Sequence, residues 1–171
     1  MLTLSLLRHA KSSWAEPSQD DFDRPLNERG VEAAPAMGKF MAAQKLAPDL
    51  ILCSTAVRAR ETLELVRPHL PRATKVEYED GLYLAAASVM LKRVRAVGGD
   101  VGHLMLVGHD PGMHGLATKL AGSGDPELLG ALAAKFSTAG LAVIVFDTKG
   151  WKAIKPGEGR LKVFMSPKRL P

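Results

Sequence analysis

Short apolar runs that alternate with helical segments constrain the fold of this 171-residue chain more than any other feature of its sequence. Three runs are strong strand candidates, because each is brief, almost wholly apolar and bounded by polar residues: Leu2–Leu7, Asp49–Cys53 and His103–Val107. Lys75–Tyr78 is a further candidate. The last two runs are typical of a closing strand pair with a turn near Lys149-Gly150, and they cover Leu141–Phe146 and Leu161–Met165.

The segments between these runs have helical character. Asn27 is a favourable N-cap for a helix that continues to Ala43, and Pro35 predicts a kink or a break inside it. Four later stretches are also expected to be helical: Ala56–Val66, Ala86–Val97, Met113–Leu120 and Pro126–Lys135. This alternation predicts an α/β fold, a three-layer sandwich with a mainly parallel central sheet and helices on both faces. The length predicts a single domain over residues 1–171.

Composition excludes several classes of protein. A hydrophobic share of 46% is enough for a substantial core and argues against a disordered chain. The single cysteine, Cys53, excludes an internal disulfide and a zinc cluster of several thiolates. The sequence has neither the features of a signal peptide nor an apolar run of membrane-spanning length, which predicts a cytoplasmic protein. The net charge of +5 suits anionic ligands without choosing among them.

Candidate functional residues follow three of the predicted strands, at the ends where ligands bind in parallel sheets. Arg8 and His9 follow Leu2–Leu7, Ser54 and Arg58 follow Asp49–Cys53, and His109 follows His103–Val107. Guanidinium groups bind phosphate oxygens with two parallel hydrogen bonds, and a neutral imidazole can attack phosphorus and hold it covalently. A second imidazole can donate a hydrogen bond to the developing charge. Together these side chains predict chemistry on a phosphoryl group.

The same segments resemble the histidine phosphatase superfamily, and specifically its SixA-type phosphohistidine phosphatases. Leu6–Trp14 is similar to the signature after the first strand, with Ala10 where glycine is usual. The second motif is matched by Ser54, Arg58, Ala59 and Thr62, and the third by Gly108-His109. The segments Asp23–Gly30 and Ser166–Leu170 are similar to the small SixA-type branch. The resemblance covers nearly the whole chain and implies the fold of phosphoglycerate mutases.

The resemblance also implies a role for each residue. His9 is expected to be the nucleophile that becomes phosphohistidine, and Arg8, Arg58 and His109 are expected to form the phosphate pocket. Ser12 and Ser13 could supplement substrate binding. No metal or cofactor is expected, because the positive charge would be supplied by the two arginines and, in part, by a protonated His109.

Many members of the superfamily have an acidic residue that protonates the leaving oxygen. The corresponding region offers Glu77, Glu79 and Asp80, none of which can be matched to the family position. The substrate therefore stays open between a phosphorylated histidine of a protein and a small phosphoester. Mutase activity is disfavoured, because the chain is short and has no insertions that would enclose a substrate.

Three rival functions fit the sequence less well. Cysteine phosphatases place five residues between cysteine and arginine, whereas four separate Cys53 from Arg58. A binding module without turnover remains an alternative, although the histidine and both arginines are present. No motif supports binding to nucleic acid, and no segment supports binding to a membrane. The chain is expected to act as a monomer or a weak dimer.

Overall fold

A computed structural model describes residues 1–171, and all seven of its strands join one sheet. The strands are β1 (Leu2–Arg8), β2 (Leu50–Ser54), β3 (Lys75–Glu79), β4 (His103–Gly108), β5 (Ala121–Gly124), β6 (Leu141–Phe146) and β7 (Gly159–Met165). Their order across the sheet is β3-β2-β4-β1-β6-β7-β5. Four of the neighbouring pairs are parallel, and the two that involve β6 are antiparallel. The predicted α/β fold with a mainly parallel sheet is confirmed.

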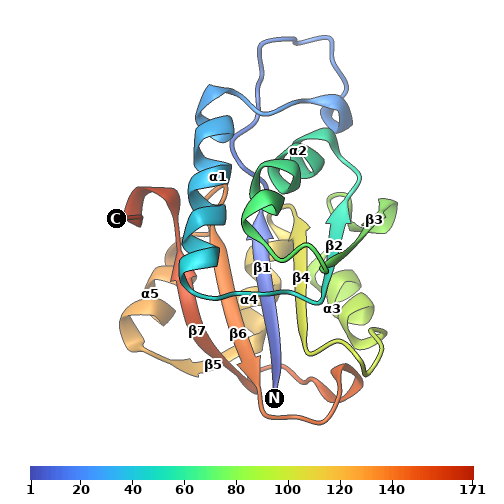
Figure 1. The fold of residues 1–171 in the computed structure, drawn as a ribbon, viewed down its shortest axis with the longest axis vertical. Coiled ribbons are helices and arrows are strands. Elements are labelled where there is room, and N and C mark those ends of the chain that lie inside the picture. The colour runs from blue at the N-terminus through green and yellow to red at the C-terminus, as the bar shows by residue number, and fades with distance from the viewer.

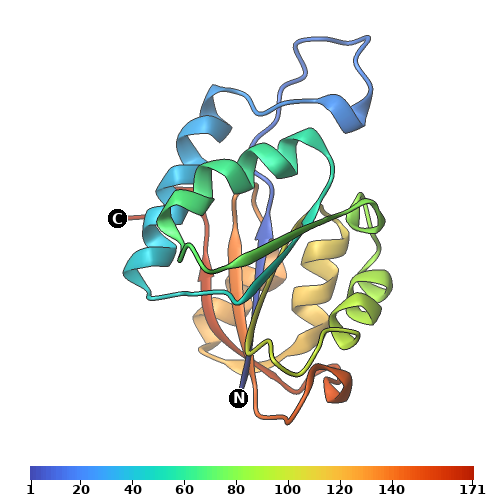
Figure 2. The same cartoon turned by 45° about the vertical axis from the view of Figure 1, so that its right-hand side comes forward.

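Five α-helices cover the two faces of the sheet. They are α1 (Glu28–Ala43), α2 (Val57–Val66), α3 (Ala87–Arg95), α4 (Gly112–Leu120) and α5 (Pro126–Ala134). Helices α1 and α2 lie on one face, and α3, α4 and α5 lie on the other (Figures 1 and 2). No helix is both long and apolar enough to cross a membrane.

The alternation of side chains along the strands builds two cores, one on each face. In β1, Leu4 and Leu6 pack with the side chains of α3, α4 and α5, whereas Leu7 packs with those of α1 and α2. In β4, Leu106 joins the first core and Val107 joins the second. Both faces of these central strands are covered, which explains why their sequences are apolar without a break.

The register of the central strands brings their carboxyl ends to one edge of the sheet. In the parallel pair β1–β4, Arg8 lies opposite Gly108, and in the pair β2–β4, Cys53 lies opposite Val107. The residues that follow these three strands therefore emerge side by side. The segment between β1 and α1 projects beyond the same edge (Figure 1).

Two local expectations need correction, and one strand was not predicted. Helix α1 continues through Pro35 without the break that had been expected as an alternative to a kink, since the ring removes only the bond to the carbonyl of Val31, a residue that is 48% exposed. The turn expected near Lys149-Gly150 is a longer connection between β6 and β7 that includes the 3-10 turn Trp151–Ala153. Strand β5 was not predicted, because a run of small residues has neither the apolar nor the β-branched character of a strand.

Close packing at Gly30 fixes the chain just after β1. The Asn27 side chain accepts the Gly30 N–H at 2.9 Å, which confirms the predicted N-cap of α1. A Cβ at position 30 would lie 2.2 Å from the carbonyl oxygen of Lys11, two residues after His9. Any larger side chain would therefore push the segment that follows His9 away from α1.

We expect Gly30→Ala to lower the free energy of unfolding by about 1–3 kcal/mol, because backbone atoms must move to admit the methyl group. The control is Gly130→Ala in α5, where nothing lies within 4 Å of the added Cβ. That change should stabilise the protein by up to about 1 kcal/mol through helix propensity alone. Urea unfolding of both variants measures the difference, and equal effects would contradict the close-packing explanation.

Candidate active site

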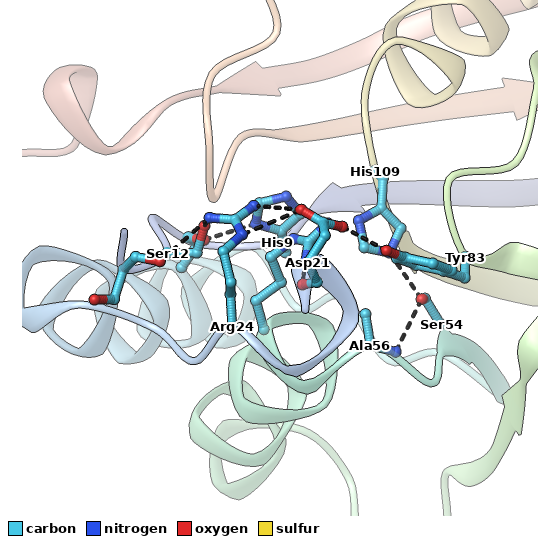
Figure 3. Close-up of polar contacts among 11 residues, drawn as sticks. His9, Ser12, Asp21, Arg24, Ser54, Ala56, Tyr83 and His109 are labelled. Atoms are coloured by element: carbon cyan, nitrogen blue, oxygen red, sulfur yellow. Dashed lines mark hydrogen bonds and ion pairs between the residues drawn. The ribbon is translucent and has the colours of Figure 1, made fainter. Parts of the chain in front are cut away.

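Two buried histidines meet at the carboxyl edge of the sheet. His9 follows β1 and His109 follows β4, and they are 6% and 2% exposed. Their ring centroids lie 5.2 Å apart with the planes tilted by 54°. Figure 3 shows both rings beside the side chains of Asp21, Ser54 and Tyr83.

The hydrogen bonds of His9 define its tautomer. Nδ1 lies 2.7 Å from the carbonyl oxygen of Ala10, so Nδ1 carries the proton and donates it. Burial, followed by the charges on His109, Arg58 and Arg8, lowers the pKa of His9 to about 3, although the bond to Ala10 raises it. His9 is thus neutral at physiological pH, with the lone pair of Nε2 free to act as a nucleophile.

His109 is assigned the same tautomer as His9. The Ser54 hydroxyl, which is fully buried, accepts the Ala56 N–H at 3.2 Å and lies 2.7 Å from Nε2 of His109. Because this hydroxyl already accepts one N–H, we assign its own proton to the bond with Nε2 and the ring proton to Nδ1, which is buried and has no partner within the protein. Burial and the charge of Arg58 lower the pKa of His109 to about 4. The expectation that a protonated His109 supplies part of the positive charge does not hold for the free protein, because the loss of solvent and the positive charges of Arg58 and Arg8 disfavour imidazolium.

Two arginines frame the histidine pair. Arg8 donates from Nη1 to the carbonyl oxygen of Phe136 at 2.9 Å and lies 3.6 Å from the Asp110 carboxylate. Arg58 is 2% exposed and donates to the backbone and the carboxylate of Asp21 at 2.7 and 2.9 Å. Both outer nitrogens of Arg58 and Nη1 of Arg8 are engaged, while the buried Nε–H of each arginine has no partner.

Thr62 of α2 connects the segment after β1 with the first turn of α2. Its hydroxyl accepts the backbone N–H of Ala10 at 2.9 Å and donates to the carbonyl oxygen of Arg58 at 2.7 Å. The residue after His9 is therefore bonded to the helix that carries Arg58. This contact fixes the nucleophile relative to the arginine.

Asp21 organises the segment that precedes α1, and sequence analysis missed it. Its carboxylate accepts hydrogen bonds from Arg58, Arg24 and the hydroxyl of Tyr83 (Figure 3). Burial alone would raise the pKa of Asp21, but the bonds from Tyr83 and Arg58 outweigh it and lower the pKa to about 2. The Tyr83 ring in turn packs edge-on against His109, with centroids 5.4 Å apart. Arg24 and Tyr83 were missed for the same reason as Asp21, since they meet the site only through tertiary contacts.

Three buried side-chain nitrogens in the whole chain lack a hydrogen-bond partner, and all three belong to this site. They are Nε of Arg8, Nε of Arg58 and Nδ1 of His109. Leaving a buried donor unpaired costs about 1–3 kcal/mol, so three of them beside one nucleophile indicate an anionic ligand with several acceptor oxygens. His9 and Arg8 also line a cavity of ≈ 350 Å³. No three His, Cys, Asp or Glu side chains come together in a way that could hold a metal ion.

Comparison with known proteins agrees with this geometry. The model of the histidine phosphatase superfamily (branch 1) matches residues 4–83. A crystal structure of a provisional phosphohistidine phosphatase SixA from Agrobacterium tumefaciens superposes with a TM-score of 0.82 at 35% identity, over 97% of this chain and 98% of the other. The chain belongs to the histidine phosphatase superfamily.

Other relatives cover the chain almost completely. An uncharacterized protein of Mycobacterium tuberculosis is 37% identical over 164 residues, which is 95% of this chain and 100% of the relative. The protein histidine phosphatase SixA in complex with tungstate superposes with a TM-score of 0.80 at 23% identity, over 99% of this chain and all of the other. The SixA-type structures thus share the fold of this histidine phosphatase over its full described length.

Two further residues, Ser12 and Ser13, were also expected to bind substrate. Ser12 and Ser13 line the same cavity as His9. The Ser12 hydroxyl accepts from Arg24 at 2.6 Å, and the Ser13 hydroxyl closes a turn with the N–H of Ala15 at 3.1 Å. Their side chains thus support the segment after the nucleophile, and their contact with substrate stays a prediction.

None of the three acidic residues considered as a leaving-group acid contacts the histidine pair. Glu79 is engaged by the guanidinium of Arg93, with its closest contact at 2.8 Å. Asp80 accepts from the Thr55 hydroxyl at 2.6 Å, and Glu77 lines a separate cavity. The carboxylates that do lie beside the site, Asp21 and Asp110, are both paired with arginines.

Two other candidates have structural roles. Cys53 is fully buried, and burial raises the pKa of its thiol to about 12, which argues against a cysteine nucleophile. The His114 ring donates to the carbonyl oxygen of Leu132, and its backbone N–H donates to Asp110, which pairs with Arg8.

We expect Asp21→Ala to lower kcat/KM for p-nitrophenyl phosphate by about tenfold, because Arg58 loses the carboxylate contact that helps to orient its guanidinium and keeps only the bond to the backbone carbonyl. The matched control is Asp23→Ala, which removes the same charge from an exposed residue of the same turn. Steady-state kinetics of both variants checks this expectation. Equal losses would mean that net charge, and not the orientation of Arg58, accounts for the effect.

Proposed function

We propose that this protein is a phosphohistidine phosphatase that works through a covalent phosphohistidine on His9. The observation that carries the proposal is the set of three unpartnered buried N–H groups around one neutral histidine. A phosphoryl group supplies three oxygens, and each of them can accept a hydrogen bond from one of these unpaired donors. The likeness to the SixA structure of A. tumefaciens supports the same activity.

In the first step, Nε2 of His9 attacks phosphorus while the bond from phosphorus to the imidazole nitrogen of the substrate breaks. Nδ1 of His9 keeps its proton and its bond to the Ala10 carbonyl, so the ring can take up positive character without moving. The donors on Arg8, Arg58 and His109 stabilise the charge on the transferring oxygens. They are fixed in place beforehand, so little reorganisation opposes the reaction.

In the second step, water attacks phosphorus and the bond from phosphorus to Nε2 breaks. Phosphate leaves with the proton from water, and His9 returns to its neutral form. The positive charge for both steps comes from the two guanidinium groups, and we propose that no metal ion is needed.

The choice of phosphohistidine over an alkyl phosphate follows from the leaving group. An alkoxide requires an acid to protonate it, and the neighbouring carboxylates of Asp21 and Asp110 are both paired with arginines. Phosphoimidazole accepts a proton from solvent on its other nitrogen near neutral pH, given an ordinary imidazole pKa of about 6.5. It then leaves as neutral imidazole without help from the protein.

We expect His9→Ala to lower kcat by at least about three orders of magnitude and to abolish trapping of a phosphoenzyme. Protein dialysed against EDTA is mixed with p-nitrophenyl phosphate, quenched in alkali and analysed by mass spectrometry. The wild type should carry an alkali-stable, acid-labile phosphoryl group on residue 9. His69→Gln, a change at a histidine outside the site, serves as the control. Trapping on another residue, or none without added metal, would count against the mechanism.

We expect kcat/KM at one pH to follow the order phosphohistidine peptide, then p-nitrophenyl phosphate, then glycerol phosphate, with at least about a hundredfold between the first and the last. The reason is the absence of an acid for the alkoxide. Comparable turnover of glycerol phosphate and the peptide would instead favour the alternative function, a metal-independent small-molecule phosphomonoesterase. Binding of all three without turnover would favour a phospho-ligand binding module.

A further inference from the structure

A groove lined by basic side chains opens beside the active-site cavity. It has a volume of ≈ 520 Å³ and lies between the start of α1, the segment after α5 and the C-terminal segment. Its cationic side chains besides Arg8 are Lys11, Arg29, Lys135 and Lys168, and we call it the basic groove. The C-terminal segment that carries Lys168 runs beside α1 (Figure 1).

The basic groove adjoins the cavity that His9 lines. Arg8, Lys11 and Thr138 line both spaces. A ligand whose phosphoryl group lies at His9 can therefore extend past Arg8 into the groove. The groove is not needed to hold the phosphoryl group itself, which has its own donors on Arg8, Arg58 and His109.

The charges in the groove are uncompensated. No Asp or Glu lines it, and none of its four further cations forms an ion pair within the protein. Like charges gathered in one concavity repel one another and raise the local positive potential. An anionic group bound there would relieve this repulsion.

The shape and composition of the groove favour a protein over a small molecule. Small-molecule sites are mostly apolar and enclose their ligand, whereas one of the ten residues lining this groove is hydrophobic and its four further cations are exposed. Three of those four are lysines, which act as point charges and lack the fork that binds phosphate with two hydrogen bonds. Carboxylates on a protein surface match them well.

We infer that the basic groove binds an acidic segment adjacent to the phosphohistidine of a protein substrate. This inference rests on the proposed function and adds the chemistry that would surround the phosphorylated residue. The groove then contributes to substrate choice and to the rate of encounter, and leaves the chemical step unchanged.

The test compares two phosphohistidine peptides, one with glutamates and one with glutamines flanking the phosphorylated residue, and p-nitrophenyl phosphate. The variant Lys135→Ser/Lys168→Ser removes two groove charges that lie outside the catalytic cavity. We expect kcat/KM for the acidic peptide to fall about three- to tenfold, with kcat/KM for the neutral peptide and p-nitrophenyl phosphate within twofold of the wild type. The salt dependence for the acidic peptide should also become shallower.

The control is Lys152→Ser/Lys155→Ser, which removes the same charge from two exposed lysines outside the groove. An equal loss in this control would assign the effect to net charge and overturn the groove. An unchanged kcat/KM for the acidic peptide in the Lys135→Ser/Lys168→Ser variant would also overturn the groove. A larger loss of kcat/KM for a small bisphosphorylated compound than for the acidic peptide would identify a small anion, and not a peptide, as the occupant. If the wild type turned over none of the phosphorylated substrates, the proposed function itself would fail, and this result differs from a failure of the groove alone.

Discussion

The parallel pairing of β1 with β4 sets the position of the two histidines at the centre of the site. Arg8 lies opposite Gly108, and each of these residues is followed by a histidine. The pairing therefore brings the ring centroids of His9 and His109 to 5.2 Å from each other. The pairing of β2 with β4 in turn brings Ser54 and the start of α2 to the same edge. A shift of one residue in either pair would turn Leu7 or Val107 toward the wrong core, so the packing of both cores fixes the register on which the chemistry depends.

The electrostatics of the site follow from desolvation near positive charge. Two imidazoles buried beside two guanidinium groups remain neutral, which leaves one ring with a free lone pair and the other with a free N–H. The tautomers are fixed by the Ala10 carbonyl and the Ser54 hydroxyl, groups that sequence motifs describe only in part. Asp21 completes the arrangement by holding the outer edge of Arg58. The Nε–H of Arg58 has no partner and remains free to bind a ligand.

The site has two regions with different tasks. Around His9, the donors are buried, few and directed, as expected for groups that stabilise a transferring phosphoryl group. Beyond Arg8, the cations are exposed and unpaired, as expected for groups that attract a charged partner. In the function that we propose, the buried donors would act on the phosphoryl group and the groove would contribute to the choice of protein substrate.

The sequence alone determined the α/β class and the mainly parallel sheet, and it predicted that Arg8, His9, Arg58 and His109 meet at one edge, since short apolar runs and the residues that follow them are local features. Strand β5 could not be predicted, because its pairing with β7 rests on backbone contacts and not on side-chain character. Asp21, Arg24 and Tyr83 join the site only when a segment before α1 folds across α2 and the turn after β3, so no spacing along the chain identifies them. The neutral state of His109 and the basic groove were likewise decided by the tertiary structure, because burial and the gathering of charges depend on distances in space that the order of residues does not contain.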